Sequence, residues 1–221
     1  MGIFFTDRLG GASSNQFASL NLGDHVGDSP EIVAANRAII SARFGPTQYM
    51  SQVHGNRVAI IEEVTEEVPT ADALVTGIPG ITLAVMVADC IPLLLRSEDA
   101  VAAVHVGRKG LVNGVAAKAI EVMREISGAE ISAVIGPAIC GECYEVSDEI
   151  FNEVIASHPE SASRTSQGTP ALDLINGLIK DLKNSKIRKI DNQSRCTQEN
   201  SDLYSYRRDG ITGRQAGLVW I

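Results

Sequence analysis

The sequence predicts an α+β fold in which mixed β-sheets carry helices on their outer faces. Short runs rich in valine, isoleucine and leucine cluster between residues 49 and 106, and helix-like periodicities flank that block. Strict alternation of strand and helix is missing, and no glycine-rich phosphate loop follows a strand, so a doubly wound parallel sheet is the weaker alternative. We expect residues 1–221 to form a single domain.

Apolar periodicity and turn residues place the elements along the chain. A first strand is expected at 3–6, and a helix at 28–43, where Asp28 or Ser29 can cap and Pro30 fits the first turn. Ile81–Val87 is apolar on both parities, which indicates a central strand covered on both faces. The remaining expectations are helices at 111–126, 147–157 and 170–184, strands at 131–135, 188–190, 203–206 and 217–221, and a mobile polar loop at 157–169.

Charge and cysteine content narrow the class of protein. The formal net charge of −8, from 19 Lys+Arg against 27 Asp+Glu, argues against a broad nucleic-acid surface. Four cysteines in 221 residues are too few for a disulfide framework. The segment Met1–Gly11 lacks a basic region followed by an apolar one, so no export signal is indicated. The longest apolar run, Ile81–Leu95, contains Asp89 and Pro92, so no membrane span is indicated. We expect a cytoplasmic protein, because so few cysteines fit a reducing compartment, and a small anion could still bind locally.

Three metal-ligand residues lie at the ends of expected strands. His54, Cys90 and His105 are 36 and 15 residues apart, whereas structural zinc sites take their ligands as closely spaced pairs. Two imidazoles and one thiolate from three elements suit a catalytic Zn²⁺, with the fourth position left for water or substrate. The alternative is two satisfied strand-end histidines and a small buried cysteine.

A second group of cysteines has weaker support. Cys140 and Cys143 have C-x-x-C spacing, but no second pair lies at finger spacing and no thioredoxin-like context surrounds them. We therefore expect a structural turn with Cys143 packed inside, and regard Cys196 and His158 as incidental. His25 is a poor fourth candidate for the metal.

Ordered matches to one family run through the whole chain. They are Phe5–Thr6, Gly10–Gly11, Ser19–Gly23, Gly27–Asp28, Asn36–Arg37, Gln52–His54, Ala71–Ala73, Ala88–Cys90, His105 with Gly107, Ile135–Pro137, Cys143–Val146, Tyr204–Gly210 and Thr212–Arg214. With these segments the chain resembles the YfiH/YlmD-like laccase-domain proteins, also labelled polyphenol oxidases or purine nucleoside phosphorylases. The resemblance implies the α+β fold of that family and a zinc ion held by His54, Cys90 and His105.

One motif departs from the family pattern. Where the family usually has His-Ala-Gly-Trp-Arg-Gly, this chain has His-Val-Gly-Arg-Lys-Gly from His105 to Gly110. The metal ligand and both glycines are kept, but the indole is lost and two cations, Arg108 and Lys109, are adjacent. We expect the substrate pocket to differ even if the metal does not.

The resemblance also implies a reaction. Members of the family are expected to cleave adenosine, inosine and 5′-substituted adenosine with phosphate, giving free base and pentose 1-phosphate, and to deaminate adenosine. Asp89 is expected to orient a ligand histidine or carry a proton to the leaving base, with a capping carboxylate as the alternative. The candidate substrate and phosphate contacts are cations, namely Arg37, Lys109, Arg207, Arg208 and Arg214.

These cations have ordinary explanations as well. Arg37 is the favoured phosphate ligand because of the family match, but it would otherwise be a solvated helix charge. Arg207 and Arg208, next to Asp209, are equally compatible with a surface ion pair.

Other functions use the same residues differently. Cys90 could be a nucleophile activated by His54 or His105, in a hydrolase or amidase acting on small peptides or cell-wall precursors. Only four histidines are present, which excludes a multicopper oxidase, although copper in place of zinc would permit weak phenol oxidation. A metal-dependent binding protein without turnover is the third class.

Overall fold

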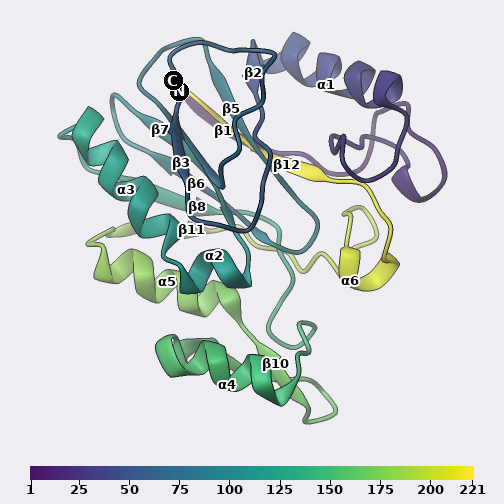
Figure 1. Cartoon of the computed structure of the whole chain (residues 1–221), viewed down its shortest axis with the longest axis vertical. Coiled ribbons are helices and arrows are strands. Elements are labelled where there is room, and N and C mark those ends of the chain that lie inside the picture. The colour runs from purple at the N-terminus through teal and green to yellow at the C-terminus, as the bar shows by residue number, and fades with distance from the viewer.

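Ten of the twelve strands form two mixed sheets, and the other two form a short hairpin. The computed structural model describes residues 1–221, and Figure 1 shows their arrangement. A four-stranded sheet runs in the order β1 (Gly2–Phe5), β12 (Gln215–Trp220), β5 (Thr82–Val87) and β2 (Thr47–Gln48). A six-stranded sheet runs in the order β11 (Lys189–Asn192), β8 (Ser132–Ile135), β6 (Ile91–Arg96), β7 (Val101–Val106), β4 (Ala73–Thr76) and β3 (Val58–Ile60). Both sheets combine parallel and antiparallel pairs, which confirms the predicted fold class.

Helices lie outside the sheets. Figure 1 shows α1 on one side of the strands and α3 and α5 on the other, with the two chain ends close together on the paired β1 and β12. The helices are α1 (Pro30–Phe44), α2 (Arg108–Val112), α3 (Val115–Ile126), α4 (Asp148–Ser157), α5 (Leu174–Asn184) and α6 (Tyr206–Asp209), with 3₁₀ turns η1 (Asn15–Phe17) and η2 (Pro159–Ser161). None of the helices combines the length and apolarity needed to cross a bilayer.

Side-chain alternation along β5 explains the layers. Leu83 and Val85 belong to the cluster between the two sheets, whereas Ala84 and Met86 pack with Ile40 of α1. Every residue of β5 is buried, as the doubly apolar pattern predicted. The molecule is therefore layered as helix, sheet, sheet and helices.

The same alternation along β7 places one of its side chains at the candidate centre. Ala103 faces the layer between the sheets, and Val104 faces the cluster shared with α3 and α5. His105 has the parity of Ala103, so it lies at the end of the layer between the sheets. Cys90 packs against that same layer.

The residues at the start of α1 explain why the helix begins there. Ser29, rather than Asp28, is the cap: its Oγ accepts from the Ile32 N–H at 3.4 Å, and Pro30 occupies the first turn. Asp28 instead accepts from the Ser29 N–H and from the Ser13 hydroxyl.

Three expected elements differ from the structure. The helix expected at 111–126 is two helices, because Gly114 adopts φ 71° between α2 and α3. Pro170–Leu172 is not helical but forms β10, which pairs with β9 (Ala162–Arg164), and Asp173 caps α5. The polar segment expected to be a mobile loop therefore contains η2 and the β9 strand of an ordered hairpin.

The strand expected at 203–206 is also wrong. Leu203 and Tyr204 are buried but irregular, because the backbone of Tyr204 pairs with the Gln215 side chain instead of a neighbouring strand. Its hydroxyl donates to the Phe17 carbonyl at 2.6 Å. The chain then turns into α6.

Candidate metal centre

The structure brings the three predicted ligands together. One ligand atom from each of His54, Cys90 and His105 lies within 4.8 Å of the others. The Cys90 sulfur is 3.8 Å from His54 Nε2, and the two imidazole rings are 4.7 Å apart between centroids in an edge-to-face arrangement. Cys90 comes from the turn between β5 and β6, His105 from the end of β7 and His54 from the loop after β2.

Asp72, fully buried just before β4, organises this centre. Its Oδ1 accepts from the His54 N–H at 2.9 Å and lies 2.9 Å from His105 Nδ1. Its Oδ2 accepts from the amides of Val53 at 3.3 Å and Gly55 at 2.7 Å. A carboxylate at Nδ1 fixes that nitrogen as the protonated one, which leaves Nε2 of His105 free to bind a metal.

The charges of the centre stabilise a thiolate. Burial raises the pKa of Cys90, but the neighbouring His105 charge and hydrogen bonds from both histidines outweigh it and lower the pKa to about 6. Burial alone would lower the pKa of His105, but Cys90 and Asp72 outweigh this effect, so the pKa is raised above its ordinary value. Burial also raises the pKa of Asp72, and His105 with the loop amides brings it below the ordinary value. Without a metal, Cys90 is thus anionic at neutral pH.

Unusual backbone conformations contribute to the metal centre. His54 and Asp89 adopt positive φ values of 59° and 103°, which non-glycine residues rarely do. At Gly107, a Cβ atom would lie 2.9 Å from the Cys90 sulfur and 3.0 Å from His54 Cδ2. The glycine after β7 is therefore required for the close approach of the ligands.

Asp89 is fully engaged with neighbouring segments. Its Oδ1 accepts from the Thr197 hydroxyl at 2.6 Å, and its Oδ2 accepts from the Arg207 N–H at 2.6 Å. Its carbonyl accepts from the Ile139 N–H at 3.0 Å. These contacts match the capping alternative, and the proton-carrier role stays a prediction.

A cavity of about 390 Å³ opens at the three ligands. Its apolar wall includes Ile139 and Leu174, and its aromatic side chains are Tyr144 and Tyr206. The remaining lining residues are His25, Gln52, Met86, Val87, Ala88, Asp89, Arg108, Arg207 and Arg214, together with the three ligands. The size and mixed lining suit a small organic molecule with an anionic part.

The predicted cations are distributed unevenly around this cavity. Arg207 and Arg214 line it, and Lys109 lines an adjoining depression beside His54 and Cys90. Arg207 also donates to the Glu145 carbonyl at 2.7 Å and lies over the Tyr144 ring. Burial lowers the pKa of Arg214 below its ordinary value, and the nearby Cys90 and Asp89 offset only part of this effect.

The other two cations point their guanidinium groups elsewhere. Arg37 donates to the Leu22 carbonyl at 2.9 Å, pairs with Asp24 at 3.2 Å and stacks on Tyr49. Arg208 donates to backbone carbonyls of residues 197, 198, 200 and 203, and pairs with Asp209 at 2.7 Å. Neither lines the cavity, so their role in binding phosphate stays a prediction.

Sequence reasoning did not single out several residues of the site. Asp72 carries the same signal as Asp89, a carboxylate beside an apolar strand, and it lies in the matched segment Ala71–Ala73. Arg108 was noted only as a replacement in the third motif, yet it lines the cavity and pairs with Glu153 at 3.3 Å. Tyr144 and Tyr206 gave no separate signal.

The second cysteine group also differs from expectation. Cys143 is half-buried rather than packed inside, and Cys196 is not incidental, because it lies with Cys140, Cys143 and Glu199 in one cluster. His158 pairs with Asp181 at 3.1 Å, away from both groups.

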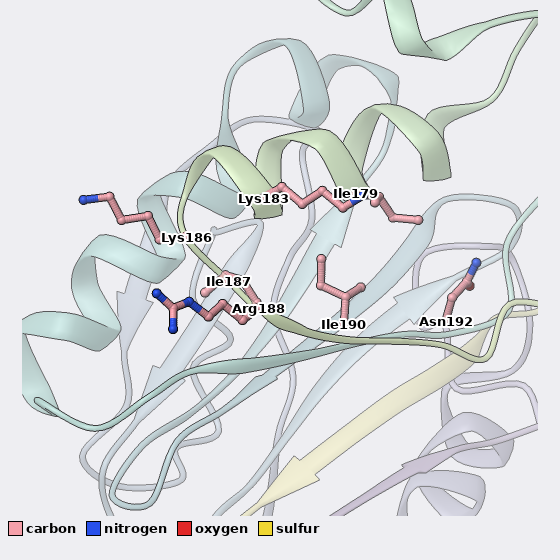
Figure 2. A pocket seen from close by; sticks show the side chains of 7 residues that line it. All are labelled: Ile179, Lys183, Lys186, Ile187, Arg188, Ile190 and Asn192. Carbon is pink, nitrogen blue, oxygen red and sulfur yellow. The ribbon is translucent and has the colours of Figure 1, made fainter.

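A second hollow lies elsewhere and is larger than the cavity at the three ligands. It measures about 680 Å³, and Figure 2 shows its lining: Ile179 and Lys183 of α5, Lys186, Ile187 and Arg188 of the following loop, and Ile190 and Asn192 of β11. It contains no histidine, cysteine or carboxylate. Of these two cavities, only the smaller one, at the three ligands, contains side chains that can bind a metal.

Comparisons with known proteins agree with this architecture. A purine nucleoside phosphorylase of Corynebacterium glutamicum is 46% identical over 98% of this chain and 93% of its own length. One from Pseudomonas aeruginosa is 35% identical over 98% of this chain and 91% of its own length.

Solved structures give the same result. A crystal structure of a Neisseria meningitidis protein has a TM-score of 0.92 and 36% identity, covering 99% of this chain and 93% of that chain. YlmD from Geobacillus stearothermophilus has a TM-score of 0.89 and 29% identity, covering 99% and 92%. The profile of the family described as multi-copper polyphenol oxidoreductase laccase matches residues 2–221. The resemblance seen in the sequence is confirmed, and the chain belongs to this laccase-domain family of YfiH and YlmD.

Proposed function

We propose that the protein is a zinc-dependent purine nucleoside phosphorylase that also deaminates adenosine. The observation that carries the proposal is the convergence of His54, Cys90 and His105 at a cavity that arginines line. Relatives covering nearly the whole chain are named purine nucleoside phosphorylases, which supports the same reaction here.

The donor set fits a zinc ion. One thiolate and two imidazoles are typical zinc ligands, and Asp72 leaves Nε2 of His105 available. Three protein ligands would leave one coordination position, and zinc there would supply Lewis-acid chemistry to the substrate. Copper binds such a donor set as well and is the natural substitute.

The cavity residues have distinct tasks in phosphorolysis. In this reaction a phosphate oxygen forms a bond to C1′ while the bond from C1′ to the base nitrogen breaks, and the base leaves with a proton. Arg207 and Arg214 would hold the phosphate, since cations stabilise the anion next to the developing charge. Tyr144 and Tyr206 would contact the nucleoside faces.

The main role of Asp89 would be to position Arg207. Both of its oxygens already accept hydrogen bonds, and one comes from the backbone of Arg207. Its expected effect is to hold Arg207 at the cavity, and a free lone pair could in addition receive a proton on its way to the base.

Chromatography of the products tests the proposal. Purified protein is incubated with inosine or adenosine, with and without phosphate. Phosphate-dependent appearance of free base supports phosphorolysis, and inosine formed from adenosine, with ammonia released, supports deamination. Loss of both in Cys90→Ala is expected because one of three metal ligands is removed. No base release by zinc-loaded wild type would contradict the phosphorylase assignment.

Arginine variants test the anion site separately. Arg214→Gln should raise the phosphate KM by about tenfold or more, since a charged hydrogen bond contributes about 1.5–3 kcal/mol. Arg188→Gln, in the remote hollow of Figure 2, is the matched control and should leave the phosphate KM unchanged. Equal behaviour of the two variants would remove Arg214 from phosphate binding.

One observation favours a second candidate, a cysteine hydrolase or amidase. Cys90 is a thiolate at neutral pH and lies 3.8 Å from His54 Nε2, which is compatible with a nucleophile and its base. Alkylation with iodoacetamide separates the functions. A zinc thiolate is protected until a chelator is added, whereas a nucleophile without metal is modified and inactivated at once.

The oxidase description of the family does not extend to multicopper chemistry in this chain. Of its four histidines, only His54 and His105 belong to the three-ligand group, and His158 pairs with Asp181. A single copper ion at this group would allow weak oxidation of phenols at most.

A further inference from the structure

A second cluster of ligand-type side chains lies outside the catalytic cavity. One ligand atom each from Cys140, Cys143, Cys196 and Glu199 lies within 4.8 Å of the other three. Around a tetrahedral zinc ion with bonds of about 2.3 Å, neighbouring ligand atoms are about 3.8 Å apart, so a small closure would complete such a shell. None of these four side chains lines the cavity at Cys90.

The four residues come from two turns with the same spacing. Cys140-x-x-Cys143 faces Cys196-x-x-Glu199, and each turn is closed in the same way. The Tyr144 N–H donates to the Cys140 carbonyl at 3.1 Å, and the Asn200 N–H donates to the Cys196 carbonyl at 3.1 Å. Two facing turns that each supply two ligands with two residues between them are typical of structural zinc sites.

Packing holds both turns in register. A parallel bridge joins Ala138 to Cys196, which brings the segment before the first turn beside the start of the second. At Gly141 a Cβ atom would lie 2.7 Å from Asp173 Cβ, so the first turn requires a glycine. The backbone therefore places the two turns side by side, and the exposed side chain of Glu199 completes the cluster.

Two contacts would stabilise thiolates that are bound to a metal here. The Cys140 N–H donates to the Cys196 sulfur at 3.4 Å, a contact that stabilises a metal thiolate. Arg208 donates to the carbonyls of Thr197 and Asn200 at 2.8 and 3.0 Å, so a permanent positive charge lies against the second turn. This cation would offset part of the negative charge of three thiolates and a carboxylate around a divalent ion.

We propose that Cys140, Cys143, Cys196 and Glu199 bind a second zinc ion with a structural role. Three sulfurs and one carboxylate oxygen complete a tetrahedral shell and leave no open position, which is the pattern of structural rather than catalytic zinc. The sulfur-rich set selects Zn²⁺ over hard cations such as Mg²⁺ or Ca²⁺.

The site would support the catalytic cavity through Asp89. The Ile139 N–H, next to Cys140, donates to the Asp89 carbonyl, and the Thr197 hydroxyl, next to Cys196, donates to its carboxylate. An ion that holds the two turns together would thus fix two of the three hydrogen-bond partners of Asp89, the residue that precedes Cys90.

Metal counting and zinc X-ray absorption on the purified full-length protein test the proposal. We expect two zinc ions per chain in wild type and an average of about two sulfurs per zinc at about 2.3 Å, since one site would offer a single thiolate and the other three. Cys196→Ser should lose one ion and lower the sulfur average to about one, whereas Cys90→Ser should lose the other ion and raise the average to about three. The wild-type spectrum remains decisive if a variant fails to fold.

Several results would overturn the proposal. These are one zinc ion per wild-type chain under zinc-replete conditions with about one sulfur around it, two ions retained in Cys196→Ser, or fewer than four free thiols in denatured protein prepared without oxygen, which would indicate a disulfide in this cluster. The phosphorylase assignment is independent of these outcomes, because nucleoside turnover is not the readout.

Discussion

Asp72→Asn would remove the negative charge behind the candidate metal centre while nearly preserving the shape of the side chain. Asp72 Oδ1 faces the His54 N–H and His105 Nδ1, and Oδ2 faces the Val53 and Gly55 amides. An asparagine retains one oxygen, so one pair of donors must face an NH₂ group. Asp72 is fully buried, and solvent cannot replace the lost partners.

The expected cost follows from the number of bonds lost. A hydrogen bond to a charged group contributes about 1.5–3 kcal/mol, so losing two should lower the free energy of unfolding by about 3–6 kcal/mol. Loss of the carboxylate that orients a metal-binding histidine typically weakens metal affinity 10–100-fold. Urea unfolding of the metal-free protein measures the first quantity, and competition for zinc with a chromogenic chelator measures the second.

The contribution of Asp72 to the free energy of unfolding should change with pH in a defined direction. Because the folded state lowers the pKa of Asp72, its contribution is fully present above the unfolded pKa of about 3.9 and is lost as pH falls through the lower folded value. The stability difference between wild type and Asp72→Asn should therefore shrink below about pH 4. Asp191→Asn, an exposed carboxylate on β11, is the control. Unfolding within 1 kcal/mol of wild type and unchanged zinc affinity in Asp72→Asn would refute the reasoning.

Three other changes test separate parts of the account. Gly107→Ala would place a methyl carbon 2.9 Å from the Cys90 sulfur, so zinc content should fall, whereas Gly128→Ala meets nothing within 4 Å and should keep it. Because the pKa of Cys90 is lowered to about 6, its alkylation in metal-free protein should stay fast at pH 7 and slow only near pH 6, and a midpoint near 8.5 would contradict this. Arg208→Gln should lower the free energy of unfolding by about 2–3 kcal/mol, because its guanidinium holds several loop carbonyls. Urea unfolding beside the exposed Arg195→Gln checks this, and an equal effect of both would oppose it.

The sequence predicted elements that depend on local signals. The start of α1 follows from Ser29 and Pro30, and burial of β5 follows from its apolar residues on both parities. The strand ends that carry Cys90 and His105 were also identifiable, because each adjoins an apolar run, whereas His54 lies in the loop between β2 and β3 and not at the end of a strand as expected. Their convergence was a hypothesis, since the order of strands in a sheet is not written in local periodicity.

Errors arose where distant contacts decide the structure. Pro170–Leu172 forms a strand because β9 lies beside it, and its helix-like neighbours gave no sign of that pairing. The sequence does not link Cys196 to Cys143 and Cys140, because 53 to 56 residues separate them, yet the Ala138 bridge brings these segments together. Asp72 was overlooked because its role depends on a loop 17 to 19 residues earlier, which the sequence does not place in space.

Zinc-dependent release of hypoxanthine from inosine tests the central claim most directly. Metal-free wild type and Cys90→Ala are supplied with inosine, phosphate and increasing zinc, and free base is measured together with bound metal. The account predicts that base release by wild type rises from background and saturates with zinc, while Cys90→Ala stays at background. Full turnover by metal-free wild type, or zinc-stimulated turnover by Cys90→Ala equal to wild type, would contradict it.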